Sequence, residues 1–227
     1  MKRFAVVVVC LLLVACASPR DYRERMVRDV ASPGKIVAVE IAFARMAREK
    51  GQWTAFREFA TDDAVMFVPV PVVARDWLRQ QKNPPLAVQW QPHMVWMSCD
   101  GSFAATKGAW QRPDGSRGYF TTLWRRQRDG DYKWVLDQGD VLDHALAEPD
   151  VIATEIADCS GELVEVANSM SNPATGLRTY AGKSSDSTLE WAMMVEPDLS
   201  RLLRVYLWQD GEKRLVLESM VAAPTTE

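Results

Sequence analysis

The sequence predicts an α+β fold, in which three helices lie across one face of a curved antiparallel sheet and a C-terminal antiparallel β meander follows. Three observations lead to this fold class. Apolar residues recur at helical spacing in residues 32–82, long strand-like runs separated by turns fill residues 86–140, and three further runs occupy residues 188–220.

The composition is typical of a globular protein. The chain has 227 residues, of which 48% are hydrophobic and 25% are charged. These fractions argue against disorder, collagen and a multi-span membrane protein. The 27 basic and 30 acidic side chains give a formal net charge of -3, so no excess of positive charge favours nucleic-acid binding.

The first residues are typical of a bacterial lipoprotein signal. A basic start precedes an apolar run over residues 4–14, which is too short for a membrane span of roughly 20 residues. The segment Leu13-Val14-Ala15-Cys16 resembles a lipobox, in which the Cys receives a diacylglycerol and becomes the new N-terminus. We expect residues 1–15 to be a lipoprotein signal peptide and the lipid on Cys16 to anchor the chain to the membrane.

Two alternatives remain for this segment, an ordinary signal peptide cleaved near Ala17 and a buried hydrophobic helix. Residue 17 is Ala rather than Asp, which by the sorting rule of enteric bacteria favours the outer membrane. We therefore expect a protein of the bacterial cell envelope, lipid-anchored in the outer membrane and facing the periplasm. The polar residues 16–31 are expected to form a tether.

Helical patterns precede the sheet. A good helix start at Ser32-Pro33-Gly34 and apolar residues at helical spacing up to Gly51 predict the first helix. Aromatic residues at three-residue intervals predict a second helix, which ends near Thr61-Asp62-Asp63. A third, shorter helix is expected in residues 74–82. Residues 64–68 between them form an extended run, which the prolines that follow keep from becoming a long central strand.

Strand patterns fill most of the remaining chain. The turns between the predicted strands are rich in Pro, Gly and Asp. Residues 171–187 are predicted to be a loop before the C-terminal meander. We expect this meander to borrow hydrophobic surface from the main domain or a partner, because two or three strands alone are marginally stable. We expect no repeat between the two strand regions beyond a generic strand–turn–strand pattern.

A family resemblance appears in motifs of fixed order and spacing. These motifs are Ala42-Phe43-Ala44 with Lys50-Gly51, Phe59-Ala60-Thr61-Asp62-Asp63-Ala64-Val65, Gly118-Tyr119-Phe120-Thr121-Thr122-Leu123-Trp124, and Asp129-Gly130-Asp131-Tyr132-Lys133-Trp134-Val135-Leu136-Asp137. Residues 34–140 resemble a nuclear transport factor 2-like domain, the cone-shaped fold shared with ketosteroid isomerases and polyketide cyclases, and are most similar to a bacterial branch of unknown function. The superfamily includes enzymes, binders and scaffolds, so the resemblance implies a fold and leaves the activity open.

The chain then divides into four parts by these patterns. They are the signal peptide in residues 1–15, the tether in residues 16–31, the nuclear transport factor 2-like domain in residues 32–140 and a C-terminal β-rich extension in residues 141–227.

The four cysteines have separate expected fates. Cys10 leaves with the signal peptide, and Cys16 carries the lipid. Cys99 and Cys159 remain in an oxidising compartment, where they form either a disulfide or two unpaired thiols. Neither has the paired spacing of a zinc site and the chain holds only 2 His, so we expect no metal and no cofactor.

The resemblance implies a carboxylate base and a hydrogen-bond donor at the mouth of an apolar pocket. The candidates are Asp63, His93, Tyr119 and Asp137. Three of them have a structural alternative: Asp63 as part of a polar turn, His93 as a surface or hydrogen-bonded histidine, and Asp137 as a partner for donors at a strand end. We keep Asp63, His93 and Tyr119 as candidate catalytic residues.

Tryptophans on the predicted sheet are the candidates for a ligand pocket. Trp90, Trp110 and Trp124 could line a site for a flat apolar ligand. The alternative is an aromatic core between sheet and helices, which we favour for most tryptophans of the sheet other than Trp90 and Trp110. The nearby basic run that begins at Arg125 is expected to be a solvated hairpin end rather than a phosphate site.

Three functional hypotheses follow. The first is a non-enzymatic envelope lipoprotein whose cone-shaped domain binds a small apolar ligand or a protein partner. The second is a small isomerase, dehydratase or cyclase that uses Asp63 or His93 with Tyr119 in an apolar pocket. The third is a homodimer that associates through the open face of the sheet.

Overall fold

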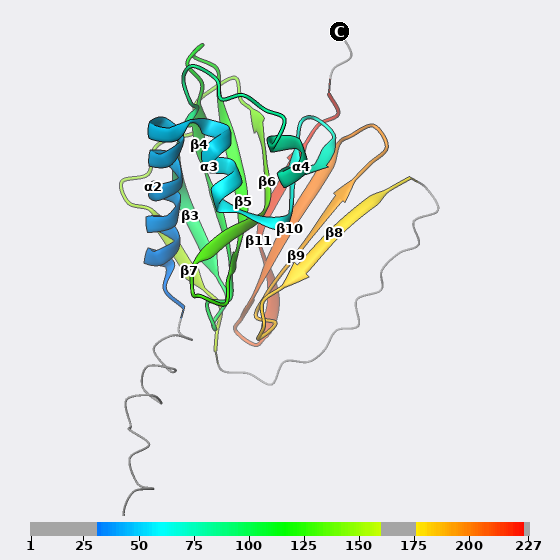
Figure 1. The fold of residues 1–227 in the computed structure, drawn as a ribbon. Helices are drawn as coiled ribbons and strands as arrows, with labels where there is room; N and C mark the ends of the chain where they lie inside the picture. The colour runs from blue at the N-terminus through cyan, green and yellow to red at the C-terminus, as the bar shows by residue number, and fades with distance from the viewer. Residues whose placement is uncertain (1–30, 160–175, 225–227) are drawn as a thin grey trace, which may run out of the picture. The chain divides into compact units, whose positions relative to one another are not determined.

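The computed structural model describes residues 31–159 and 176–224. The predicted signal peptide, most of the tether and the predicted lipidation site Cys16 lie outside the described residues. The elements in chain order (Figure 1) are α2 (Pro33–Lys50), α3 (Gln52–Phe59), β1 (Ala60–Phe67), β2 (Pro71–Val73), α4 (Ala74–Leu78), β3 (Gln89–Met97), β4 (Phe103–Gln111), β5 (Arg117–Arg126), β6 (Tyr132–Val141), β7 (Ala153–Ile156), β8 (Arg178–Lys183), β9 (Leu189–Val195), β10 (Arg201–Gln209) and β11 (Glu212–Val221).

The described strands form two sheets. The larger sheet has seven strands in the order β2-β1-β6-β5-β4-β3-β7, and the smaller has four in the order β11-β10-β9-β8. The seven-stranded sheet is mixed, because β1 runs parallel to β6 and β7 runs parallel to β3. Figure 1 shows the helices on one side of this sheet and the four-stranded sheet on the other.

The predicted fold class, a cone of three helices on an antiparallel sheet with a β meander, is wrong. Strands make up 48% of the described residues and helices 17%, and the large sheet is mixed rather than antiparallel. The second and third helices are short, with 8 and 5 residues. Thr61-Asp62-Asp63, expected at a helix end, belong to β1, which begins directly after α3. A strand that follows a helix in this way can pair in parallel with the distant β6.

Helix α2 positions much of the interior. Pro33 occupies its first turn, where a missing N–H costs nothing, and Gly51 ends the helix with a φ of 102° that favours glycine. Its buried face packs on the sheet through Ile36 and Phe43. The same face carries the buried Glu40, which is a charged residue type on an otherwise apolar stripe.

Both faces of the seven-stranded sheet are buried. One apolar core lies between this sheet and the helices, with Phe43, Trp124 and Trp134 at its centre. A second core lies between the two sheets, where Leu123 and Leu136 meet apolar residues of the four-stranded sheet. Complete burial of one such side chain contributes about 1.5–3 kcal/mol, so the two sheets hold each other in place.

The C-terminal meander has one strand more than the sequence indicates. Strands β9, β10 and β11 lie where strand-like runs were expected. Strand β8 lies within the predicted loop of residues 171–187. The sequence pattern does not predict this strand, because it is an edge strand whose residues are mostly exposed. Alternation of apolar and polar residues, the usual strand signal, is weak in such a strand.

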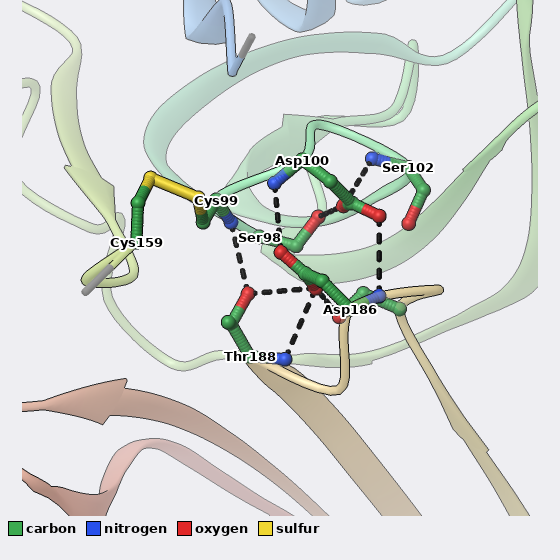
Figure 2. Close-up of a disulfide and its surroundings, with 8 residues drawn as sticks. Ser98, Cys99, Asp100, Ser102, Cys159, Asp186 and Thr188 are labelled. Atoms are coloured by element: carbon green, nitrogen blue, oxygen red, sulfur yellow. Dashed lines mark hydrogen bonds between the residues drawn. A yellow bond between two sulfur atoms is a disulfide. The ribbon is translucent and has the colours of Figure 1, made fainter. Parts of the chain in front are cut away.

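Cys99 and Cys159 form a disulfide in the structure, with an S–S distance of 1.99 Å. Figure 2 shows this bond beside the turn that joins β3 to β4. Cys159 follows β7, which pairs with β3, so the disulfide fastens the end of β7 to the turn after β3. No helix of the described residues is long and apolar enough to cross a membrane.

Candidate functional site

A cavity of about 390 Å³ lies between the helices and the seven-stranded sheet. Its volume is within the range of small-molecule sites, which are usually lined by apolar and aromatic side chains with a few polar groups. Helices α2 and α3 and strands β1 and β3 to β5 supply its aromatic walls. The aromatic residues that line it are Phe43, Trp53, Phe56, Trp90, Trp110, Phe67 and Phe120.

Two glycines let aromatic rings lie flat against the sheet at this cavity. Gly118 is paired with Trp110 across β4 and β5, and Gly108 is paired with Phe120. A Cβ atom on Gly118 would collide with the indole of Trp110, and one on Gly108 would collide with the ring of Phe120. Each ring therefore occupies the space that a neighbouring side chain would need, which keeps the wall of the cavity in place.

The rings of the cavity also contact one another edge to face. The ring of Phe43 lies 4.7 Å from that of Trp90 and 4.8 Å from that of Phe56, measured between centroids. Such pairs contribute about 0.5–1.5 kcal/mol beyond their buried area, so the helices and the sheet hold a defined aromatic surface.

Asp137 places a carboxyl group on the cavity wall. It lies on β6 opposite Thr122, whose hydroxyl donates a hydrogen bond to its Oδ2 at 2.6 Å. Burial raises the pKa of Asp137 to about 7, because an ionised carboxylate loses its water in this apolar setting, and the hydrogen bond from Thr122 opposes that effect. Near neutral pH this group can therefore either donate or accept a proton.

Glu40 is a second buried acid behind the cavity wall. Its side chain accepts hydrogen bonds from the hydroxyl of Thr106 at 2.6 Å and from the indole N–H groups of Trp90 and Trp124, each at 3.2 Å. Burial raises the pKa of Glu40 to about 7 against these donors, and the negative charge of Asp137 adds to the rise. Because Trp90 lines the cavity, Glu40 fixes the orientation of one wall.

The rim of the cavity is polar and charged. The guanidinium of Arg112 lies over the ring of Trp110, 4.5 Å from its centroid, and both residues line the cavity together with Asp140. A cation on an indole face is held by electrostatic attraction to the ring. The site thus combines an aromatic interior, one inward carboxyl group and a charged edge.

The candidate Asp63 lies outside this cavity. It is exposed on β1, where the guanidinium of Arg125 forms an ion pair with its Oδ1 at 2.9 Å. The hydrogen bond from Arg125 holds the pKa of Asp63 below its usual value. Arg125, predicted to lie in a solvated basic run, is thus the partner of this acid.

Tyr119 and His93 also lie away from the cavity. The Tyr119 side chain is directed to the four-stranded sheet, where its hydroxyl donates to the carbonyl of Met220 at 3.0 Å, and burial raises its pKa. His93 lines a separate polar hollow of about 330 Å³ with Arg117 and Glu148. Partial burial lowers the pKa of His93, and the charge of Glu148 opposes this.

The predicted pocket tryptophans divide into two groups. Trp90 and Trp110 line the cavity, whereas Trp124 is completely buried in the core and donates to Glu40. Sequence reasoning weighed Asp137 and set it aside, and it did not consider Glu40 as a site residue. The signal for Glu40 was present, because an acid at a helical position that faces the core needs partners and commonly has a shifted pKa.

No group of three or more His, Cys, Asp and Glu side chains that could hold a metal ion occurs in residues 31–159 and 176–224. The inward acids are hydrogen-bonded by hydroxyl and indole donors instead.

The fold is similar to several solved structures over about half of this chain. A candidate ketosteroid isomerase from Parabacteroides distasonis shares 14% identity at a TM-score of 0.40, with 51% of this chain and 97% of that chain covered. A candidate aromatic ring hydroxylase from Novosphingobium aromaticivorans shares 16% identity at a TM-score of 0.36, with 49% and 91% covered. A protein from Catenulispora acidiphila in complex with S-DNPA shares 14% identity at a TM-score of 0.37, with 48% of this chain and 91% of that chain covered.

The identities of these three matches lie between 14% and 16%. No protein-family model and no curated protein matches the chain.

The buried acids predict an unusual pH dependence of stability. Their folded-state pKa values lie above those of the unfolded chain, so between about pH 4.5 and 7 the folded state binds more protons than the unfolded state. The free energy of unfolding of the wild type should therefore fall as the pH rises through this window, by about 3 kcal/mol for a fully buried carboxyl. The substitution Glu40→Gln should remove the part of this fall in the free energy of unfolding that comes from Glu40.

Urea unfolding at several pH values measures this effect. Glu49→Gln is the matched control, because Glu49 lies exposed on the same helix. A Glu40→Gln profile with the slope of the wild type and of the control would contradict the assignment of a raised pKa to Glu40.

Proposed function

We propose that this domain binds a small, mainly apolar molecule that carries at least one hydrogen-bonding group. The observation that supports this proposal is the aromatic cavity of about 390 Å³ with the carboxyl group of Asp137 on its wall. Aromatic side chains recognise flat or cyclic apolar groups through large contact areas, and the single polar group fixes the orientation of the ligand.

Asp137 has a defined part in this binding. In its neutral form the carboxyl group donates a hydrogen bond to a carbonyl or ether oxygen of the ligand, and in its ionised form it accepts one from a hydroxyl or amine. Thr122 keeps the Oδ2 atom occupied at 2.6 Å, which leaves Oδ1 for the ligand. Arg112 at the rim suits a ligand that carries an acidic or carbonyl group at its outer end.

An enzyme of the isomerase, dehydratase or cyclase type is the second candidate function. The specific observation in its favour is a pKa of about 7 for Asp137, which suits a general acid or base that works at neutral pH. This enzyme proposal assigns the acid or base role to Asp137 rather than to Asp63, His93 or Tyr119, which lie outside the cavity. A base of this kind could remove a proton next to a carbonyl group of the bound molecule.

We further propose that the protein is a lipoprotein of the bacterial envelope, anchored by a lipid on Cys16. The lipobox-like segment supports this, and a disulfide between Cys99 and Cys159 suits an oxidising compartment such as the periplasm. The cavity would then face the periplasm and sample molecules at the outer membrane.

Replacement of the lipidated residue tests the anchor. Wild-type protein should fractionate with the outer membrane and incorporate a labelled fatty acid, because its acyl chains partition into the bilayer. Cys16→Ala should abolish the label and release or arrest the chain, while Cys10→Ala should leave both properties unchanged. Fatty-acid label retained in Cys16→Ala would show that the lipid site is elsewhere.

Native mass spectrometry tests the ligand site. Residues 17–227 purified from a periplasm should carry a small molecule, and its mass would narrow the reaction or binding class. Asp137→Ala should weaken binding of the same molecule by about tenfold, because one buried hydrogen bond contributes roughly 1–1.5 kcal/mol. Asp63→Ala is the control, since this residue is exposed and outside the cavity.

Two outcomes decide between the candidates. A molecule that is bound and released unchanged supports the binding function, whereas a molecule converted by the wild type and not by Asp137→Asn supports the enzyme. Equal binding by Asp137→Ala and the wild type would contradict the placement of the site.

A further inference from the structure

We infer that strands β8–β11 are a second copy of strands β3–β6 in the same chain, and that this copy occupies the sheet face that a partner subunit would otherwise cover. Both sets are four consecutive antiparallel strands in which each strand pairs with the next. The sequence alone gave no expectation of a repeat, because the strand residues differ. The correspondence is clear in the turns and in the contacts between the two sets.

The first turn of each set has the same construction. Ser98 precedes β4 in the first set, and Ser184 precedes β9 in the second. The hydroxyl of Ser98 donates to Asp100 at 2.7 Å and accepts from the first N–H of β4 at 3.1 Å. The hydroxyl of Ser184 donates to Asp186 at 2.6 Å and accepts from the first N–H of β9 at 3.0 Å.

The backbone of these two turns also agrees. The residue after each Asp has a positive φ, 63° at Gly101 and 59° at Ser187. The strand register beyond the turn is the same, since Met97 pairs with Ala104 and Lys183 pairs with Glu190 at an equal distance from the turn.

The second turn repeats the sequence Pro-Asp-x-Ser. In the first set Asp114 accepts from the N–H and hydroxyl of Ser116 at 2.8 and 2.7 Å, and in the second Asp198 accepts from those of Ser200 at 2.9 and 2.7 Å. The residue between them is Gly115 with a φ of 87° in the first set. In the second it is Leu199 with a φ of 70°, a conformation that a branched side chain rarely adopts. The turn geometry is retained although the glycine is replaced.

The remaining strands contain matching residues at matching positions. Leu123 pairs with Leu136 in the first set and Val205 pairs with Leu217 in the second, and a register shift follows Leu123 and Val205 alike. The sequences Asp129-Gly130 and Val135-Leu136 match Asp210-Gly211 and Val216-Leu217. The leucines of the first set and those of the second all lie in the core between the two sheets.

The two copies contact each other reciprocally. The N–H of Asp100 donates to the carboxylate of Asp186 at 2.8 Å, and the N–H of Asp186 donates to the carboxylate of Asp100 at 3.2 Å (Figure 2). The N–H of Cys99 donates to the hydroxyl of Thr188 at 2.9 Å, and the N–H of Ser185, which corresponds to Cys99, donates to the hydroxyl of Ser102 at 2.8 Å.

Such reciprocity is the property of a two-fold, isologous interface, in which position i contacts j and position j contacts i. Gln138 and Ser219 agree with it, because they occupy corresponding positions and are hydrogen-bonded to each other at 2.9 Å. A residue that contacts its own counterpart is expected close to a two-fold axis. The face through which a homodimer was expected is therefore covered by the chain's own second copy.

The second copy does not repeat the cavity. By their positions in the ladders, the hydrogen-bonded pair Thr122 and Asp137 of the cavity wall corresponds to Arg204 and Glu218. These two side chains form an ion pair at 2.8 Å on the face of the small sheet that is turned away from the large sheet. An ion pair thus stands where the first copy has a hydroxyl hydrogen-bonded to a buried acid, and the copy serves to cover the large sheet.

A pair of mutant cycles tests the inference on residues 17–227 with the disulfide intact. Asp100→Ala and Asp186→Ala should each lower the Tm, by similar amounts, and the double variant should depart from the sum of the two because the residues contact each other across the interface. Asp114→Ala and Asp198→Ala form the control cycle and should be additive, because each carboxylate is bonded within its own turn. If an alanine variant does not fold, the corresponding Asp→Asn variants serve in its place.

Light scattering gives the second readout. The protein should have the mass of a single chain at every concentration reached, since the face is already occupied. A dimer that persists on dilution, or an Asp100 and Asp186 cycle as additive as the control, would overturn the inference.

Discussion

Strand β5 is buried on both of its faces, and the rest of the structure depends on this. Residues 118–124 are all buried, with alternate side chains directed to the helices and to the four-stranded sheet. A central strand of this kind is stable only when both sides are covered. The helices cover one side and leave a cavity there, and the C-terminal sheet closes the other side.

This double burial explains the chemistry of the site. The helix side contains acids that cannot be hydrated fully, so Glu40 and Asp137 both have raised pKa values and both rely on hydroxyl or indole donors. A buried carboxyl group is stable when it is hydrogen-bonded or neutral. The same conditions that allow these acids to be buried bring their titration close to neutral pH.

The covering of the opposite face gives the molecule its asymmetry. The first two turns have the same construction in both halves of the sandwich, and only the first half has helices in the described residues and a cavity beneath them. The second half keeps the apolar side that faces its partner and has an ion pair, Arg204 with Glu218, on the other. One chain therefore contains a two-fold packing surface with a single candidate site.

The sequence predicted the first helix, the strands of residues 86–140 and the tryptophans Trp90 and Trp110, because regular periodicity and aromatic clustering are local signals. It did not predict the parallel pairings of β1 and β7, which depend on segments distant in the chain. Tyr119 and Phe120 show why the site was harder to locate. Adjacent strand residues point to opposite faces, so the register decides which of the two reaches the cavity.

Two substitutions test the central claim, that the aromatic cavity beside Asp137 is the binding site. Phe120→Arg places a guanidinium in the cavity, where it can pair with Asp137, and Arg204→Phe is the control on the outer face of the small sheet. Native mass spectrometry of both variants, each checked for folding by its circular dichroism, should find the small molecule on Arg204→Phe and not on Phe120→Arg. A folded Phe120→Arg variant that retains the molecule would contradict the account.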